Sequence, residues 1–201
     1  MITIVLATAN ADKAREIVDA LGDQFDVIPR PSDVPDVEET GTTLEENARL
    51  KAVALVEATG QAALADDTGL EVDALDGAPG VYSSRYSGEH ATYADNVAKL
   101  LSELAGVAPE HRTARFRTVA LIRFPDGREL VAEGAVTGTV AVVAAGDDGF
   151  GYDPVFVPDE GDGRTFAQMT LTEKNAISHR GRAVRAAAAL LRQAVSESRS
   201  R

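Results

Sequence analysis

The sequence predicts an α/β fold, and two observations support this prediction. In the first third of the chain, short apolar runs typical of buried strands alternate with amphipathic segments of helical spacing. Between residues 109 and 145, three strand-like runs follow one another without a helix between them, which indicates an antiparallel sub-sheet. With 201 residues, the chain is long enough for one large domain or for two small lobes.

The chain opens with a strand, a short turn and a helix. Residues 2–6 are apolar and rich in β-branched side chains, which predicts a buried strand. A helix follows the turn at residues 7–13, because apolar side chains within residues 17–21 share one face and Gly22 provides a stop. The backbone N–H groups in the first turn of such a helix have no partner within the helix and can bind an anion.

Two interpretations of this turn stay open. Lys13, in the first helical turn, is unfavourable for the helix dipole unless an anion compensates for it. Alternatively, Thr8 or Asn10 simply caps the helix. The turn lacks the glycines of a P-loop, so that motif does not decide between the two.

After a second strand, predicted at residues 25–28, and a proline-rich loop, a capping box marks the start of a long helix. Either Thr42 with Glu45 or Thr43 with Glu46 has the required spacing, and Gly60 would end the helix. The two alternatives differ by one residue in where the helix begins.

Charged residues flank and enter this helix. Glu38 and Glu39 precede it, and solvated loop charges are their simplest interpretation. They could instead supply a carboxylate to Mg²⁺, which takes oxygen ligands from one or two carboxylates plus substrate phosphates. Lys51 lies among apolar neighbours, where a lysine that extends its amine to solvent is the simple interpretation.

Two adjacent carboxylates, Asp66 and Asp67, follow the apolar residues 62–64. We expect a short buried strand there that ends in a turn at Gly69, before residues 70–75 form another strand. A buried carboxylate pair repels itself, so a cation or a shared proton is the usual remedy. Because neighbours on an extended backbone point to opposite sides, the two aspartates are expected to have different roles.

A hairpin and a further strand dominate the second half. Thr92 starts an amphipathic helix, and strands at residues 113–124 and 128–132 flank the turn at residues 125–127. A third strand is expected at residues 135–144. These strands make up the predicted antiparallel sub-sheet.

Glycines flank Phe150 in a loop at residues 146–157. Such glycines let the backbone approach a ligand closely, and an exposed aromatic ring suits stacking on a flat heterocycle. Asp153 could then accept hydrogen bonds from ring N–H groups. The alternative is a tight turn with Phe150 packed into the core.

The densest basic cluster of the chain consists of Lys174, His179, Arg180 and Arg182. Residues 178–182 are expected to open the last helix, which is alanine-rich over residues 184–195. A single histidine is most often structural. At a helix start, however, these side chains could present donors to an anion or to an exocyclic oxygen of a base.

Composition narrows the possible partners. A formal net charge of −12 disfavours duplex DNA or RNA, whereas a small anion remains possible beside a local basic cluster or a metal. Hydrophobic and charged contents of 44% and 26% are ordinary for a soluble globular protein. We expect no signal peptide and no membrane span, and the absence of cysteine suits a cytoplasmic location.

Together these features describe a nucleotide site. The helix start with Lys13 suits a phosphate chain, and the carboxylates Glu39, Asp66 and Asp67 suit a divalent cation. Phe150 and the basic cluster suit a flat heterocycle. Each feature is weak alone, and their combination carries the hypothesis.

A series of short motifs occurs in one order along the chain. They are Thr8-x-Asn10-x-x-Lys13, Glu39-Thr40-Gly41 with Glu46-Asn47-Ala48, Ala65-Asp66-Asp67-Thr68-Gly69-Leu70, Gly77-Ala78-Pro79-Gly80-x-Tyr82-Ser83, Gly149-Phe150-Gly151-Tyr152-Asp153-Pro154 and Ser178-His179-Arg180-Gly181. This series closely resembles the inosine/xanthosine triphosphate pyrophosphatase family, the house-cleaning nucleotide hydrolases. The resemblance covers nearly the whole chain. Thr68 stands where serine is expected in many relatives, and it keeps the hydroxyl.

The resemblance implies an elongated α/β fold of two lobes around a central mixed β-sheet, with the active site in the cleft between them, and a homodimer. It implies Mg²⁺-dependent hydrolysis of ITP, dITP and XTP to the monophosphate and pyrophosphate. Asp67 is then the base that activates water, and the metal ligands are Glu39, Asp66 and Asp67. The implied substrate-binding residues are Thr8, Ala9, Asn10, Lys13, Lys51, Thr68, Phe150, Gly151, Tyr152, Asp153, Lys174, His179 and Arg180.

Two rival functions stay open. One is a nucleotide pyrophosphatase similar to septum-formation inhibitors, which would act on methylated or pyrimidine nucleotides. The other is a nucleotide sensor that does not hydrolyse its ligand. The paired aspartates argue against the sensor, because a pure binder of polyanions gains nothing from added negative charge unless a metal is present.

Overall fold

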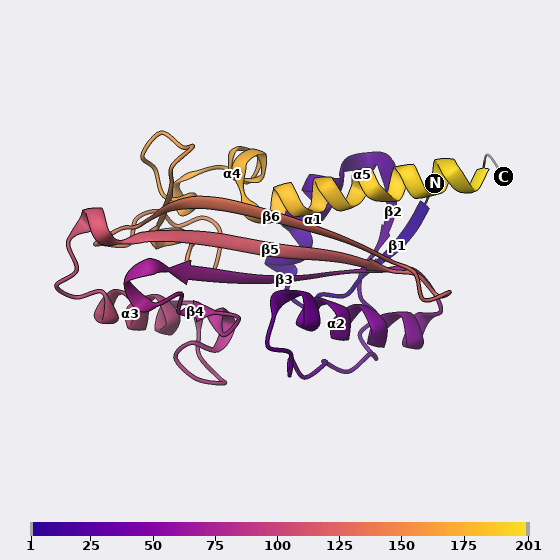
Figure 1. The fold of residues 1–201 in the computed structure, drawn as a ribbon, viewed down its shortest axis with the longest axis horizontal. Helices are drawn as coiled ribbons and strands as arrows, with labels where there is room; N and C mark the ends of the chain where they lie inside the picture. Colours follow the sequence, from indigo (N-terminus) through magenta and orange to yellow (C-terminus); the bar gives the residue numbers. More distant parts are fainter. Residues whose placement is uncertain (1, 200–201) are drawn as a thin grey trace. The chain divides into compact units, whose positions relative to one another are not determined.

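The computed structural model describes residues 2–199 and confirms the α/β class (Figure 1). Its seven-stranded sheet has the order β2-β1-β3-β5-β6-β7, with β4 paired to β3. The strands are β1 (Ile2–Leu6), β2 (Phe25–Ile28), β3 (Ala63–Val72), β4 (Pro79–Gly80), β5 (Thr113–Arg123), β6 (Glu129–Val140) and β7 (Phe156–Pro158). The helices are α1 (Ala11–Leu21), α2 (Leu44–Thr59), α3 (Tyr93–Glu103), α4 (Leu171–Ile177) and α5 (His179–Arg199).

The sheet is mixed, as predicted. β1 pairs in parallel with both β2 and β3, and the register places Val5 opposite Ile28 and Ala63. β6 and β7 are antiparallel, with Val140 opposite Phe156. The two short segments β1 and β2 are joined through α1, which is the usual way to connect parallel strands.

The chain forms two compact units, and the long strands contribute to both. Within the described residues, the first unit comprises residues 2–67, 118–134 and 180–199, and the second comprises residues 68–117 and 135–179. The boundaries therefore fall within β3, β5 and β6 and directly before Arg180.

Each unit has its own apolar core. In the first, Ile4 of β1, Ile17 of α1 and Leu191 of α5 are buried together. Figure 1 shows α1 and α5 on one face of the sheet in this unit and α2 on the other. In the second unit, Phe156 packs edge-on against Phe116, with ring centroids 4.7 Å apart. Aromatic pairs of this kind add to the stabilisation that area burial provides.

Local signals located several helix ends correctly. The capping box of α2 is the Thr43–Glu46 pair, and Gly60 ends the helix in the left-handed conformation. The predicted start of α3 at Thr92 is also confirmed by a capping box. Such caps satisfy the backbone N–H groups that a helix start leaves without partners.

Two predictions of strand ends were wrong. No turn interrupts the chain at Gly69, because β3 runs without a break through both aspartates to Val72. The predicted strands at residues 128–132 and 135–144 are one strand, β6, in which small and apolar residues keep a period of two across Gly134. Within residues 2–199, no helix has both the length and the apolar character needed to cross a membrane.

Candidate active site

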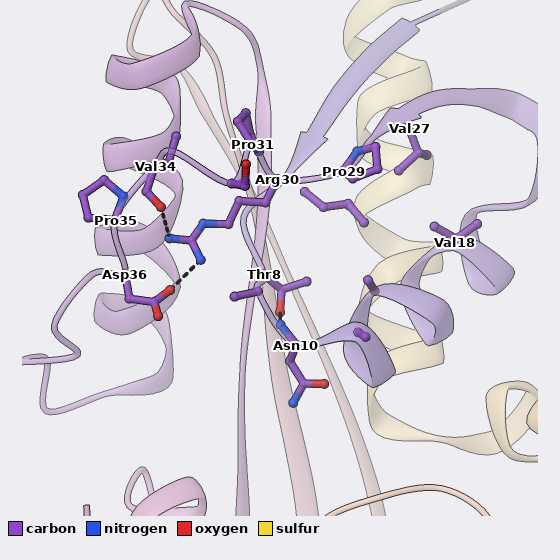
Figure 2. A pocket seen from close by; sticks show the side chains of 15 residues that line it. Thr8, Asn10, Val18, Val27, Pro29, Arg30, Pro31, Val34, Pro35 and Asp36 are labelled. Atoms are coloured by element: carbon purple, nitrogen blue, oxygen red, sulfur yellow. Dashed lines mark hydrogen bonds and ion pairs between the residues drawn. The ribbon is translucent and has the colours of Figure 1, made fainter. Parts of the chain in front are cut away.

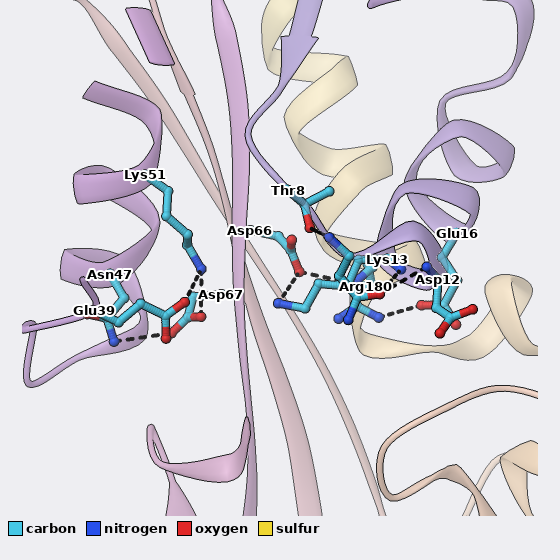
Figure 3. A network of polar contacts seen from close by, with 11 residues as sticks. Thr8, Asp12, Lys13, Glu16, Glu39, Asn47, Lys51, Asp66, Asp67 and Arg180 are labelled. Atoms are coloured by element: carbon cyan, nitrogen blue, oxygen red, sulfur yellow. Dashed lines mark hydrogen bonds and ion pairs between the residues drawn. The ribbon is translucent and has the colours of Figure 1, made fainter. Parts of the chain in front are cut away.

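Asp66 and Asp67 lie in the middle of β3, and both are buried, with 2% and 4% of their surface exposed. Because adjacent side chains of a strand point to opposite faces, the two carboxylates enter different surroundings. Figure 3 shows Asp67 directed toward α2 and Asp66 directed toward α1 and Arg180. This geometry supports different roles for the two residues.

The Asp67 cluster consists of Glu39, Asn47, Lys51 and Asp67. The Lys51 ammonium lies 2.8 Å from Oδ1 of Asp67 and 3.1 Å from Oε1 of Glu39, so one cation joins the two carboxylates. Asn47 donates from Nδ2 to Oδ2 of Asp67 at 3.4 Å. Asn47 and Lys51 are four residues apart on α2, and this spacing places them on one helix face.

Burial and charge shift the pKa values of this cluster. Burial lowers the pKa of Lys51, but the carboxylates of Asp67, Asp66 and Glu39 outweigh it, so the net pKa is raised and the ammonium persists at neutral pH. Burial also raises the pKa of Asp67, and although Lys51 and Lys13 oppose this effect, the net pKa lies above the ordinary value. Asp67 is therefore more basic than an exposed aspartate, which suits a general base.

The Asp66 cluster consists of Lys13, Glu16, Asp66 and Arg180. Nε of Arg180 donates to Oδ2 of Asp66 at 3.0 Å, and Nζ of Lys13 lies 3.6 Å from the same oxygen. Nη1 of Arg180 also forms an ion pair with Glu16. Arg180, Glu16 and Asp66 are all buried, so this network replaces water as the partner of each charge.

Asp66 remains ionised in this network. Burial by itself raises the pKa of Asp66, but the cations of Lys13 and Arg180 outweigh it and hold the pKa well below the ordinary range. Burial lowers the pKa of Lys13, and the attraction of Asp66 offsets this effect only in part. Because two cations already engage Asp66, its predicted role as a metal ligand stays a prediction.

Glu39 and Asp67 are the carboxylates whose arrangement best fits a divalent cation. Their oxygens converge on one ammonium, so they can also reach a common metal ion. No group of three or more acidic, histidine or cysteine side chains within residues 2–199 could hold a metal by itself. Two carboxylates fit a hard divalent cation that completes its coordination with phosphate oxygens and water.

The turn after β1 is organised by its own side chains. Oδ1 of Asn10 accepts hydrogen bonds from the N–H groups of Asp12 at 2.9 Å and Lys13 at 3.2 Å. Oγ1 of Thr8 accepts one from the N–H of Asn10 at 3.1 Å. The capping interpretation is thus confirmed for Asn10, and the binding of an anion by this turn stays a prediction.

A pocket of about 730 Å³ borders this turn (Figure 2). Thr8, Ala9 and Asn10 line one side, and residues of α1 and of the loop at residues 29–36 line the others. The loop contributes prolines and Val34, and also Arg30, which is paired with Asp36. Its volume is in the range of small-molecule pockets. The pocket includes none of the charged residues of the Asp66 and Asp67 clusters.

In the second unit, the loop that carries Phe150 is fixed by Asp153. The N–H of Phe150 donates to Oδ2 of Asp153 at 2.8 Å, and Lys174 forms an ion pair with the same oxygen. Gly149 has φ +73°, and a Cβ there would lie 2.2 Å from Oδ2 of Asp153, so only glycine fits.

Phe150 itself is half-buried, and the alternative that it packs into the core is wrong. Its ring centroid lies 5.7 Å from that of Tyr93, and Nζ of Lys174 lies 5.0 Å from the ring centre. A cation so placed is attracted by the π-electrons of the ring. The loop thus presents a partly exposed aromatic ring next to the ammonium of Lys174.

Tyr152 and His179 are buried in the second unit. The Tyr152 hydroxyl donates to the carbonyl of Ser83 at 2.9 Å. The His179 ring stacks on Phe116, with centroids 4.3 Å apart and an interplanar angle of 11°. Both contacts are structural, and the predicted binding roles of these residues stay predictions.

The structure divides the predicted site residues between the two units. The first unit holds Thr8, Ala9, Asn10, Lys13, Glu39, Lys51, Asp66, Asp67 and Arg180. The second unit holds Thr68, Phe150, Gly151, Tyr152, Asp153, Lys174 and His179.

Two members of the clusters were absent from the predicted site residues. Glu16 is on the buried face of α1 next to Ile17, and a glutamate on an apolar helix face is a signal for a buried ion pair. Asn47 directly follows the capping box of α2 and is fully buried. Asparagine is a poor former of helix interiors, so its presence there indicates a specific partner.

The α/β fold carries two adjacent buried carboxylates, each paired with a lysine, and these are groups that can bind a metal ion and phosphates. Comparison with known proteins identifies the family. The model of the Ham1 family matches residues 4–190, so the chain belongs to the Ham1 family. A protein of Nitratidesulfovibrio vulgaris named dITP/XTP pyrophosphatase is 53% identical over an alignment of 195 positions, which covers 91% of this chain and 92% of that protein.

Further relatives agree with this membership. A protein of Streptomyces coelicolor, also named dITP/XTP pyrophosphatase, is 48% identical over an alignment of 201 positions, which covers 96% of this chain and 98% of that protein. The structure of a HAM1 protein from Coxiella burnetii is similar, with a TM-score of 0.85 and 41% identity over 96% of this chain and 100% of that one.

Proposed function

We propose that this protein hydrolyses deaminated purine nucleoside triphosphates such as dITP, ITP and XTP to the nucleoside monophosphate and pyrophosphate. The names of relatives at 48–53% identity support this substrate class. The observation that carries the proposal is the Asp67 cluster, where a carboxylate of raised pKa shares a lysine ammonium with a second carboxylate.

A divalent cation, Mg²⁺ in this proposal, would be held by Glu39 and Asp67, and Asp66 remains a candidate third ligand. When bound, it neutralises the charge of the phosphates and of the transition state. The convergence of Glu39 and Asp67 on one cation supports this assignment.

The other groups of the first unit would act on the phosphates and on water. Asp67 accepts a proton from the attacking water, and its raised pKa supports this role. Lys51 and Lys13 bind phosphate oxygens, together with the turn formed by Thr8, Ala9 and Asn10 at the start of α1. Release of pyrophosphate as one unit requires contacts along the whole phosphate chain, which two lysines and a helix start can supply.

The residues of the second unit would recognise the base. Phe150 stacks on the purine, and its partial exposure and the nearby Lys174 support this role. Thr68, Gly151 and Tyr152 would line the binding site. Asp153, Lys174, His179 and Arg180 are the proposed contacts to the edges of the base.

Selectivity would follow from the oxygen at C6 of hypoxanthine and xanthine. Side chains that donate hydrogen bonds favour this oxygen, whereas the C6 amine of adenine would place donor against donor. A site built for such a hydrogen bond rejects an analogue that cannot form it by a large factor.

A substrate panel tests this proposal. We expect rapid release of pyrophosphate from dITP, ITP and XTP in the presence of Mg²⁺, and values of kcat/KM for ATP lower by about 10³-fold or more. Preference for methylated or pyrimidine nucleotides would contradict the substrate class. A homodimer and a cytoplasmic location, both expected from the resemblance and composition, belong to the same proposal and are checked by light scattering and fractionation.

The pH dependence of kcat/KM should report on Asp67. Because the carboxylate is the active form of the base, activity falls as the pH decreases through the pKa of Asp67, which burial raises and the Lys51 ammonium lowers. Lys51 holds this pKa down, so Lys51→Met should move the acid limb to higher pH. Lys99→Met, which changes a partly exposed lysine of α3, serves as the control. A limb that stays in place in Lys51→Met would contradict the assignment.

A further inference from the structure

Asn47 connects the loop that carries Glu39 to Asp67. Its side chain is fully buried in the first turn of α2. Oδ1 accepts a hydrogen bond from the N–H of Gly41 at 2.8 Å, and Nδ2 donates to Oδ2 of Asp67 at 3.4 Å. One amide therefore uses its acceptor on the loop and its donor on the carboxylate.

The close approach of this loop depends on Gly41. A Cβ at that position would lie 2.6 Å from Oδ1 of Asn47 and 2.7 Å from Cβ of Glu46, which is closer than real Cβ contacts. The absence of a side chain thus lets the backbone reach the amide of Asn47. Glu39 is two residues away, so this contact restricts where its carboxylate can lie.

Lys51 completes the arrangement one helical turn later. Its ammonium contacts Oδ1 of Asp67, whereas Asn47 contacts Oδ2, so α2 holds both oxygens of the carboxylate. Two different contacts fix the plane of the carboxylate, which a single ion pair leaves free to rotate. A carboxylate that must accept a proton from water in one direction requires such alignment.

The chain contains a second asparagine in the same local setting. Asn96 follows the capping box of α3 as Asn47 follows that of α2, and it is also buried. Its Oδ1 accepts from the N–H of Ser87 at 2.8 Å, and its Nδ2 donates to the carbonyl of Ser84 at 3.0 Å. Asn96 therefore joins a loop to a helix in the same way, but its donor contacts the backbone and not a carboxylate.

We propose that Asn47 is a positioning residue that aligns Asp67 and the Glu39 loop for the attack of water. This inference rests on the proposed function. The structural part of its role is shared with Asn96, and the contact with Asp67 is the part specific to catalysis. Partners of this kind, which orient a catalytic or metal-binding carboxylate, typically change activity by about 10- to 100-fold when replaced.

Asn47→Asp tests whether the contact of Asn47 with Asp67 contributes to catalysis. The new side chain has nearly the same shape and keeps an acceptor for Gly41, but it places an oxygen against Asp67 where a donor was. We expect kcat for dITP at saturating Mg²⁺ to fall by about 10- to 100-fold and KM to stay within about threefold. Asn96→Asp makes the same change against a carbonyl, and its kcat should stay within about twofold of the original once both variants are shown to be folded.

Amide exchange tests the link to the loop without any need for turnover. The N–H of Gly41 should exchange slowly in the original protein and in Asn47→Asp, and at least about 10-fold faster in Asn47→Ala, which removes the acceptor. If Asn47→Asp does not fold, Asn47→Ala and Asn96→Ala replace the pair in the kinetic comparison. If the original protein hydrolyses none of the nucleotides, the proposed function fails, while the exchange result still decides whether Asn47 holds the loop.

Three results would overturn the inference. They are an unchanged kcat in the Asn47 variant, an equal loss in the matched Asn96 variant, and unchanged Gly41 exchange in Asn47→Ala. The first two remove the catalytic part of the role, and the third removes the connection to the loop.

Discussion

Replacement of Asp67 by asparagine should lower kcat for dITP by about 10²- to 10⁴-fold, the range expected when a general base is lost. Asparagine keeps the shape of the side chain but cannot accept a proton from water. Because burial already disfavours the charged form of Asp67 and raises its pKa, the neutral amide should cost little stability. Affinity for the nucleotide, measured by calorimetry, should remain within about 10-fold, since Lys13 and Lys51 are retained.

The matched control is Asp23→Asn, which removes one exposed carboxylate of the first unit. It should leave kcat unchanged, because it alters the net charge by the same amount but belongs to neither cluster. A kcat of Asp67→Asn near that of the original protein would eliminate Asp67 as the base. Loss of binding together with loss of turnover would assign Asp67 to the metal alone.

The second large effect is expected on stability. Arg180→Met should lower the free energy of unfolding by about 3–5 kcal/mol, because it leaves the buried carboxylates of Glu16 and Asp66 with Lys13 as the remaining cation of their cluster. For a chain of this length, that loss corresponds to a decrease in Tm of roughly 6–20 °C. Arg192→Met, which removes an exposed arginine of the same helix, should change stability by about 0.5 kcal/mol or less.

A double variant identifies the cause of this loss. If unpaired carboxylates destabilise Arg180→Met, adding Glu16→Gln should recover part of the lost stability, whereas Glu16→Gln alone should be destabilising. The contribution of Asp66 to the free energy of unfolding also depends on pH. Because the pKa of Asp66 is depressed, its contribution is complete above the unfolded value of about 3.9 and decreases as the pH falls below it. Additive effects of the two substitutions would contradict the role assigned to the buried network.

Local sequence signals were sufficient for helix starts, because a capping box is contained within four residues. Thr43 with Glu46 and Thr92 with Asp95 are examples. The first two strands were also located correctly, since their apolar runs are short and continuous. These features depend on neighbours in the sequence, so the sequence alone predicts them.

The surroundings of the aspartate pair could not be predicted in this way. Adjacent charges next to Gly69 have the composition of a turn, yet they lie inside a buried strand. The cations that make this possible come from distant positions, and Arg180 is 114 residues from Asp66. The motif series of the family indicated the residues of the site, but not that Arg180 is paired with Glu16 or that Asn47 contacts Asp67.

The position of bond cleavage tests the central claim most directly. Hydrolysis of dITP in water enriched in ¹⁸O, followed by mass spectrometry of both products, shows which phosphorus water attacks. If water activated by Asp67 attacks the α-phosphorus, one ¹⁸O atom appears in the monophosphate and none in the pyrophosphate. Label in pyrophosphate, or release of orthophosphate in place of pyrophosphate, would contradict the proposed reaction.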